Sequence, residues 1–192
     1  MSTQLNTIEK NELAVSVGRI AQPGQYLTFV LGGEAYALGI LHIKEIIDYG
    51  DITEVPMMPE FIRGVINLRG RVVPVVDLAA RFGRGTTKVA KRTGIVIVET
   101  VGGSDGDGED KQQDIGIIVD AVNEVVDIGS QDIEPAPAFG ARIRPDFING
   151  MAKREGHFII LLNVDRVLSV DEMAALSRAV VDDYQTSSDG YE

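Results

Sequence analysis

The stretch Phe61-Ile-Arg-Gly-Val-Ile-Asn-Leu-Arg-Gly-Arg-Val-Val-Pro-Val-Val-Asp-Leu78 decides the fold of this chain. Its two apolar runs, Val65 to Leu68 and Val72 to Val76, have strand length and are rich in β-branched residues. Arg69-Gly70 separates them and predicts a tight turn, because glycine adopts φ > 0 without steric cost. The stretch therefore predicts a β-hairpin, called the signature hairpin below.

The signature hairpin has a second copy 86 residues further along. At this offset Phe147, Ile148, Gly150 and Gly156 align with Phe61, Ile62, Gly64 and Gly70. At an offset of 79 residues Glu124, Asp127, Gly129 and Pro135 align with Glu45, Asp48, Gly50 and Pro56. The matched order and hydrophobic pattern predict an ancient duplication, and hence two similar β subdomains in one body.

The two hairpins differ in their charges. Asn67-Leu-Arg-Gly-Arg71 in the first copy corresponds to Lys153-Arg-Glu-Gly-His157 in the second. The shared glycines and apolar residues are therefore predicted to be structural, and the charges of the first copy to be specialised. We expect Arg63, Arg69 and Arg71 close together around one rim. The local pattern alone leaves open whether they are ordinary solvated residues or a binding site.

Composition limits the possible classes of protein. With 44% hydrophobic residues among 192, the chain is predicted to fold around its own core. The absence of cysteine excludes disulfides, thiolate catalysis and cysteine-based metal sites. No apolar run approaches the roughly 18 residues of a membrane span, and residues 1 to 24 lack the features of a signal peptide. These observations predict a cytoplasmic protein without direct membrane insertion.

Charge is unevenly distributed over the chain, whose net charge is −11. Residues 63 to 92 contain eight basic residues and a single acid, Asp77. Such a segment could bind nucleic acid, as small β-barrels often do. Against this, Phe82 is its only aromatic residue, so platforms for base stacking are missing, and acidic residues follow it. A protein partner is favoured, with nucleic-acid binding as the alternative.

Hydrophobic patterning predicts mostly antiparallel β structure in two small barrels, followed by a helix. Strands are expected at Gln25 to Leu31, Ala35 to Ile40, Thr93 to Val101 and Ile115 to Val119, with a loop at Gly102 to Gln113. Leu41 to Ile47 fits either a helix or a strand. A short helix capped by Asp77 is possible over residues 77 to 82, and a helix is expected over Asp171 to Asp183. Residues 1 to 24 are expected to be a flexible leader, and residues 182 to 192 an acidic tail.

Pro74 limits the pairing of the second strand of the signature hairpin. Because proline lacks a backbone N–H group, this strand must lie at a sheet edge or leave that position unpaired.

Signs of catalysis or metal binding are weak. The run Asp105-Gly-Asp-Gly-Glu-Asp110 resembles a calcium loop but lacks the ligand spacing of an EF-hand. His42 and His157 are far apart, and no nucleophile motif or phosphate-binding loop is present. We therefore expect a non-enzymatic protein with no cofactor and no metal.

Six sequence segments together resemble the CheW family, the coupling proteins of bacterial chemotaxis. They are Tyr26-Leu-Thr-Phe-Val-Leu-Gly-Gly-Glu-Ala-Tyr36, Ile43-Lys-Glu-Ile46, Phe61-Ile-Arg-Gly64, Asn67-Leu-Arg-Gly70, Val73-Pro-Val-Val-Asp-Leu78 and Gly116-Ile-Ile-Val-Asp120, and the similarity extends over residues 25 to 181. The resemblance implies two five-stranded SH3-like barrels with a hydrophobic groove between them. It also implies a non-catalytic adaptor that joins methyl-accepting chemoreceptors to the regulatory domain of the histidine kinase CheA in membrane-associated arrays.

The resemblance also assigns site residues. Receptor binding is expected at Ile43, Glu45, Ile46, Asn67, Arg69 and Gly70. Kinase binding is expected at Ile52, Val55 and Gly64. In the family the matching glutamate and arginine are thought to pair, so the resemblance implies an ion pair between Glu45 and Arg69. This agrees with the physical expectation that a nearby carboxylate holds an arginine in place on an aliphatic surface.

Overall fold

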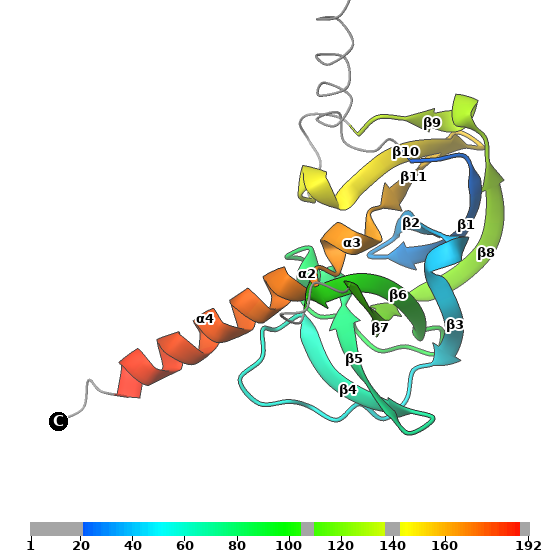
Figure 1. The fold of residues 1–192 in the computed structure, drawn as a ribbon. Helices are drawn as coiled ribbons and strands as arrows, with labels where there is room; N and C mark the ends of the chain where they lie inside the picture. Colours follow the sequence, from blue (N-terminus) through cyan, green and yellow to red (C-terminus); the bar gives the residue numbers. More distant parts are fainter. Residues whose placement is uncertain (1–20, 105–109, 137–142, 189–192) are drawn as a thin grey trace, which may run out of the picture.

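The computed structural model describes residues 21–104, 110–136 and 143–188 as two curved β-sheets with a long C-terminal helix (Figure 1). The strands are β1 (Gly24–Leu31), β2 (Glu34–Gly39), β3 (Ile43–Asp48), β4 (Ile62–Leu68), β5 (Arg71–Asp77), β6 (Gly94–Ser104), β7 (Asp110–Val119), β8 (Ala121–Ile128), β9 (Ile133–Glu134), β10 (Ile148–Arg154) and β11 (His157–Leu162). The helices are η1 (Ile40–His42), α2 (Leu78–Arg81), η2 (Ser130–Asp132), η3 (Pro145–Phe147), α3 (Val164–Val167) and α4 (Val170–Ser188).

The middle of the chain forms one sheet and its two ends form the other. The central sheet has the strand order β3-β6-β7-β5-β4, and the terminal sheet has the order β8-β1-β2-β11-β10-β9. This confirms the predicted mainly β class with two similar subdomains, the terminal sheet gaining the two-residue strand β9. Among the described residues no ladder joins β3 to β4, so the central sheet is an open barrel.

Both alignments that indicated a duplication are confirmed by strand pairing. The hairpins β4–β5 and β10–β11 share their register at an offset of 86, including a bulge after Ile62 and after Ile148. At an offset of 79, β3 pairs with β6 as β8 pairs with β1, again with a bulge in each pair. Short helices capped by Asp77 and Asn163 follow the two hairpins. The subdomains are therefore two copies of one unit.

The core lies between the sheets and is shared by them. Side chains of both sheets form its largest cluster of buried apolar residues. Four rings cross it in sequence, Phe29, Tyr36, Phe82 and Phe147, with centroids 6.1, 5.8 and 6.0 Å apart. Beside this core, η1 connects the two sheets and borders a hollow of about 300 Å³ where Leu41 is 97% exposed. Its lining comes from η1, from the terminal sheet and from residues 21–23, so it is not the groove between the two subdomains that the resemblance implies.

Several predicted boundaries change in the structure. Strands β6 and β7 continue into the predicted loop Gly102 to Gln113, of which residues 105–109 lie outside the described residues, as does most of the calcium-like run. A Cβ atom on Gly102 would lie 2.9 Å from Val170, so this glycine permits close packing against α4. Helix α4 is longer than predicted at both ends.

Both ends of the folded body extend past their predicted limits. Ala21 is buried and donates a backbone hydrogen bond to Asn149 over 3.1 Å, so the body begins before Gln25. Residues 1–20 of the predicted leader lie outside the described residues. At the other end, α4 continues through residue 188, into the predicted tail.

Pro74 lies in a central strand. Strand β5 pairs with β4 on one side and with β7 on the other, and the ladder with β7 begins at Val75. The proline therefore precedes that ladder, which is the second of the two predicted options. The ambiguous segment Leu41 to Ile47 is resolved as the end of η1 followed by β3.

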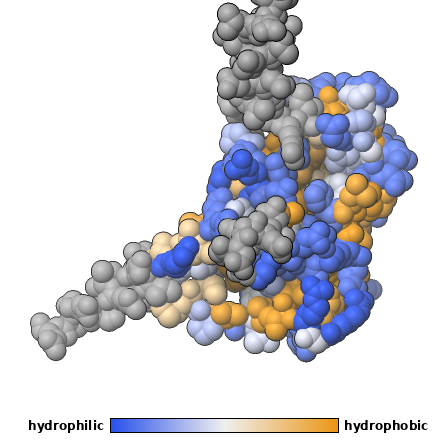
Figure 2. Space-filling model, viewed as in Figure 1, coloured by the Kyte–Doolittle hydropathy of each residue, from blue (hydrophilic) through white to orange (hydrophobic). Residues whose placement is uncertain are grey.

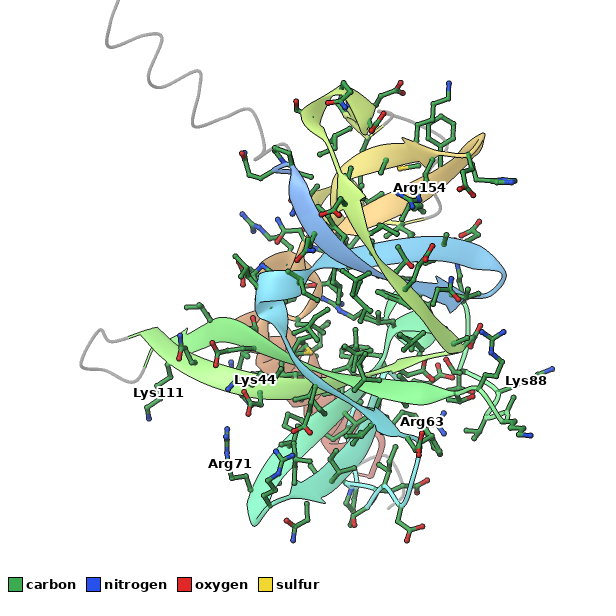
Figure 3. All side chains as sticks on the ribbon, turned by 90° about the vertical axis from the view of Figure 1, so that its right-hand side faces the viewer. Lys44, Arg63, Arg71, Lys88, Lys111 and Arg154 are labelled. Atoms are coloured by element: carbon green, nitrogen blue, oxygen red, sulfur yellow. The ribbon has the colours of Figure 1, made fainter. Side chains whose placement is uncertain are left out.

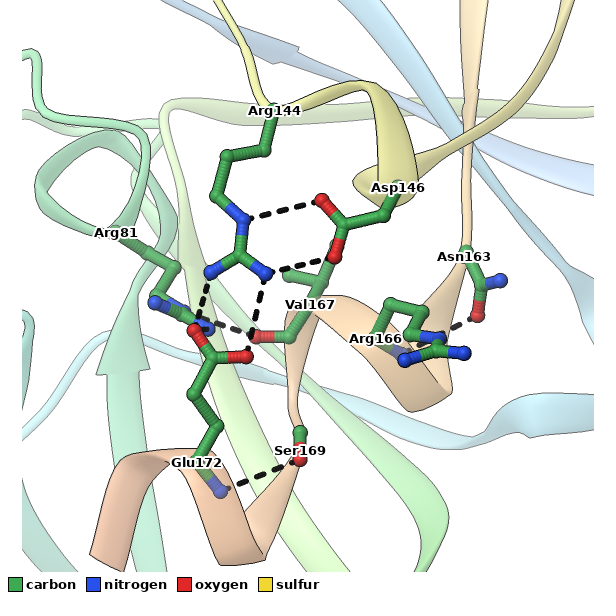
Figure 4. Close-up of polar contacts among 8 residues, drawn as sticks. All are labelled: Arg81, Arg144, Asp146, Asn163, Arg166, Val167, Ser169 and Glu172. Atoms are coloured by element: carbon green, nitrogen blue, oxygen red, sulfur yellow. Dashed lines mark hydrogen bonds and ion pairs between the residues drawn. The ribbon is translucent and has the colours of Figure 1, made fainter. Parts of the chain in front are cut away.

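Helix α4 is anchored by charged residues from both subdomains (Figure 4). Glu172 accepts from Arg81 of α2 over 3.1 Å and also pairs with Arg144, which binds Asp146 over 2.7 Å. Arg81 is only 5% exposed and lies over the rings of Phe61 and Phe147. This junction fixes the base of α4 where the subdomains meet.

The junction predicts a loss of stability in acid. Burial alone would raise the pKa of Glu172, but hydrogen bonds from Arg144 and Arg81 outweigh it and lower this pKa below its ordinary 4.5. Because the pKa of Glu172 is lower in the folded than in the unfolded state, its ionised carboxylate stabilises the fold above pH 4.5. This contribution is lost as the pH falls below 4.5 and through the pKa of the folded state. We expect urea denaturation to show this loss, and the Glu172→Gln variant to show a shallower decline over the same pH range. Parallel curves for the two proteins would contradict this role of Glu172.

Candidate functional site

The tip of the signature hairpin is a two-residue turn in an uncommon conformation. Arg69 and Gly70 both have positive φ, 53° and 82°, as the tight hairpin turn requires. Asn67 stabilises the turn, since its Oδ1 accepts a hydrogen bond of 2.8 Å from the backbone N–H of Gly70. The predicted receptor-binding residue Asn67 thus holds the turn in shape. In the second copy Glu155 and Gly156 have nearly the same φ values, 51° and 78°.

Arg69 forms a two-pronged ion pair with Glu45 across the sheet. Its Nη1 and Nη2 donate to Oε1 and Oε2 of the carboxylate over 2.8 and 2.9 Å. This confirms the predicted ion pair. The side chain of Arg69 is 75% exposed and that of Glu45 is 26% exposed. The carboxylate therefore fixes an arginine that remains open to a partner.

Further charged residues that the sequence reasoning did not connect surround this pair. A hollow of about 280 Å³ is lined by Lys44, Glu45, Leu68, Arg69, Arg71, Val73 and Asp114. Asp114 binds Lys44 and Arg71, each over 2.8 Å, and Lys44 also binds Glu99 over 2.7 Å. Lys44 and Arg71 lie at the same end of the central sheet (Figure 3). We call Lys44, Arg71 and Asp114 the rim cluster.

The two predicted isoleucines lie outside this hollow. Ile43 is half-buried and packs against the shared core. Ile46 is 47% exposed and follows Glu45 directly in β3, so the two side chains point to opposite faces of the strand. Lys44 and Glu45 can both line the hollow because a bulge interrupts the pairing of β3 between Ile43 and Glu45.

The prediction that Arg63 shares a rim with Arg69 and Arg71 is wrong. Arg63 lies near the base of the hairpin, where it contacts Asp77 over 3.5 Å and Tyr49 over 3.4 Å. Figure 3 shows Arg63 on the opposite side of the sheet from Arg71. Asp77 is fully buried and also accepts hydrogen bonds of 2.7 Å from the backbone N–H and hydroxyl of Thr87. The pattern of charges did not reveal this buried partner.

The predicted kinase-binding residues lie along the segment before β4 and at the start of that strand. Ile52 and Val55 are half-buried, and the neighbouring Met57 and Met58 are 46% and 39% exposed. Figure 2 shows apolar side chains among polar ones at the lower edge of the body, where Figure 1 places the central sheet. Gly64 is buried, with φ 143°, so it has no side chain or exposed surface to offer a partner.

The basic segment 63 to 92 is largely neutralised by acids, four from elsewhere in the chain and one, Asp77, within the segment. Five of its eight basic residues form ion pairs, namely Arg63, Arg69, Arg71, Arg81 and Arg84. Its aromatic residue, Phe82, is buried in the stack of core rings. The segment therefore does not present the continuous cationic surface with stacking rings that a nucleic acid would require.

Neither a membrane-spanning helix nor a group of metal ligands is found in the part of the chain that the structure describes. No helix there is long and apolar enough to cross a membrane. Within the same ranges, no three His, Cys, Asp or Glu residues are grouped so that they could hold a metal ion.

Comparisons with known proteins agree with this geometry. The CheW-like domain model matches residues 25–172. The chemotaxis protein CheW of Klebsiella aerogenes is 34% identical over 150 residues, covering 78% of this chain and 84% of that protein. CheW of Helicobacter pylori is 29% identical over 175 residues, covering 89% and 99%.

A solved structure gives the same result. The scaffolding protein TtCheW from Thermoanaerobacter tengcongensis superposes with a TM-score of 0.67 at 38% identity, covering 78% of this chain and 90% of that one. The residues that the family model matches, 25–172, include strands of both sheets and the Glu45–Arg69 pair. The chain belongs to the CheW-like family of chemotaxis coupling proteins, a family of adaptors and scaffolds rather than enzymes.

Proposed function

We propose that this protein couples the cytoplasmic tips of chemoreceptors to the regulatory domain of the histidine kinase CheA and supports kinase activation in the receptor array. It acts in the cytoplasm, next to membrane-bound receptors. The observation that carries this proposal is the exposed arginine Arg69, fixed by both oxygens of Glu45 on a strained turn. A fixed arginine beside aliphatic side chains is typical of protein interfaces.

The duplication supports a specialised role for this hairpin. Its second copy keeps the turn geometry but has Glu155 where the first has Arg69. Glu124 corresponds to Glu45, so the second copy places two acids where the first forms an ion pair. The shared fold therefore does not require the Glu45–Arg69 pair, which supports a binding role.

A reconstitution experiment tests the function. Purified protein is mixed with a receptor cytoplasmic fragment and CheA, followed by co-sedimentation and measurement of kinase autophosphorylation. We expect a ternary complex and kinase activation that depends on this protein. Absence of both, together with salt-sensitive binding to DNA or RNA, would favour the nucleic-acid alternative instead.

The kinase-binding surface is predicted to lie on the central subdomain alone. Val55→Asp and Met58→Asp should each weaken CheA binding about tenfold or more, because a carboxylate is buried against an apolar partner surface. The double change Arg154→Ala and Glu155→Ala, on the second copy, should leave the affinity within about twofold. Titration calorimetry with the CheA regulatory domain measures both. Equal losses on the two subdomains would overturn this assignment.

A further inference from the structure

The hollow beside the Glu45–Arg69 pair separates its charged side chains by depth. Asp114 is 6% exposed and Glu45 26%, whereas Arg69 and Arg71 are 75% and 65% exposed. The acids therefore lie inside the hollow and the guanidinium groups lie at its mouth. In a chain of net charge −11, the most exposed charged groups of this hollow are thus two guanidinium groups, although acids pair with both of them, and Leu68 and Val73 form an aliphatic floor.

Asp114 holds this arrangement together. Its two carboxylate oxygens bind different cations, Oδ1 binding Lys44 from β3 and Oδ2 binding Arg71 from β5. The rim cluster thus joins strands β3, β5 and β7 on the side of the Glu45–Arg69 pair. Without Asp114, Arg71 would lose its only ion pair found among the described residues, and a long exposed side chain samples many rotamers.

The duplicated subdomain forms the same face without these residues. Its counterpart hollow is lined by Ala35, Asn123 and His157, which occupy the positions of Asp114, Lys44 and Arg71. The fold therefore does not need a buried carboxylate here. Burial of an ion pair brings little net stability, because desolvation offsets the attraction between the charges. A role in binding explains Asp114 better than a role in folding.

We propose that the hollow and the Glu45–Arg69 pair form a docking face for the chemoreceptor, and that Asp114 is a positioning residue of this face. Asp114 holds Lys44 and Arg71 beside Arg69, so that the hollow selects a chemoreceptor segment bearing a carboxylate. This inference rests on the proposed function and names the partner chemistry of the same site. Charge complementarity is its basis, since guanidinium groups at the mouth pair with a carboxylate in two-pronged geometry. The aliphatic floor accommodates apolar side chains next to that carboxylate.

Binding measurements with altered receptor fragments test the proposal. The probes are a receptor cytoplasmic fragment and variants in which one Glu or Asp of its tip is replaced by the amide. At least one amide variant should bind wild-type protein about tenfold more weakly, as expected for the loss of a charged hydrogen bond. The Arg71→Gln protein should bind the native fragment more weakly by a similar factor. It should bind the amide fragment as tightly as wild-type protein binds that amide fragment, because the same interaction is already lost there.

Asp114→Ala, which copies Ala35, provides the decisive comparison. In this variant the ratio of affinities for the native and the amide receptor fragment should fall from about tenfold to about threefold or less. Its melting curve should stay close to that of wild-type protein. Asp114→Glu, which keeps the charge, should recover part of the preference. An unchanged preference in Asp114→Ala would overturn the proposal, as would Arg71→Gln weakening CheA binding but not receptor binding.

A further variant separates this inference from the proposed function. If Arg69→Asp loses receptor binding but Asp114→Ala keeps its full preference, only the role of Asp114 fails. If Arg69→Asp binds every fragment normally, the proposed docking face itself fails.

Discussion

Arg69→Asp is expected to abolish receptor-coupled kinase activation while the protein remains folded. The substitution removes a mostly exposed guanidinium and places a carboxylate next to Glu45, so two like charges replace an ion pair. Because the pair is exposed, solvent screens it and the folded state depends little on it. Aspartate also tolerates the positive φ of 53° at this turn, so the hairpin should keep its shape.

Charge reversal and the second copy supply the controls. Combining Arg69→Asp with Glu45→Arg restores opposite charges and should recover part of the activation. Glu155→Lys changes the charge at the same turn position of the second hairpin and should leave activation unchanged. Autophosphorylation in reconstituted receptor–CheA complexes gives the activity, and thermal denaturation gives the stability. Full activity of Arg69→Asp, or a loss explained by unfolding, would show that the site is wrong.

Gly64→Ala is expected to destabilise the folded protein strongly. A Cβ atom at this position would lie 2.1 Å from the carbonyl oxygen of Thr53, and φ is 143°. Thr53 and Val65 exchange backbone hydrogen bonds of 2.9 and 2.8 Å beside this contact, so the backbone cannot yield without breaking them. Steric overlap and backbone strain together should cost about 3 kcal/mol, or roughly 10 °C in melting temperature.

A glycine of the same hairpin serves as the matched control. Gly70 also has positive φ, 82°, but no atom lies within 4 Å of an added Cβ, so Gly70→Ala should cost only about 1 kcal/mol. Urea denaturation compares the two variants. The loss of kinase binding in Gly64→Ala should follow displacement of the Ile52 to Met58 segment. Normal stability with lost binding would instead make Gly64 a direct contact.

Local chemistry in the sequence determined the elements of this protein. Arg69-Gly70 between two β-branched runs specified a hairpin, because only a short turn with positive φ joins strands so closely. Asp77 specified the start of α2, because its side chain accepts from backbone N–H groups two and three residues later. The repeat was readable because two copies of one fold must keep the same glycines and apolar positions. Glu45 and Arg69 were identified through resemblance to a family.

Tertiary structure alone decided which elements lie side by side. The terminal sheet combines β1 and β2 with β8 to β11, so strands from opposite ends of the chain become neighbours. In the central sheet, β7 lies next to β5 and so places Pro74 in the interior of that sheet. Local patterns cannot encode these pairings, because hydrophobic periodicity specifies which face of a strand is buried but not which strand lies next to it.

The rim cluster shows the same division between sequence and structure. Lys44 and Asp114 are separated by 70 positions in the chain, yet their charged atoms lie 2.8 Å apart because β6 lies between β3 and β7. In the sequence, Asp114 comes shortly after the acidic run Asp105 to Asp110, and no pattern distinguishes it from those acids. Its burial and its two cationic partners follow from sheet order and from the bulge in β3, which only the folded chain possesses.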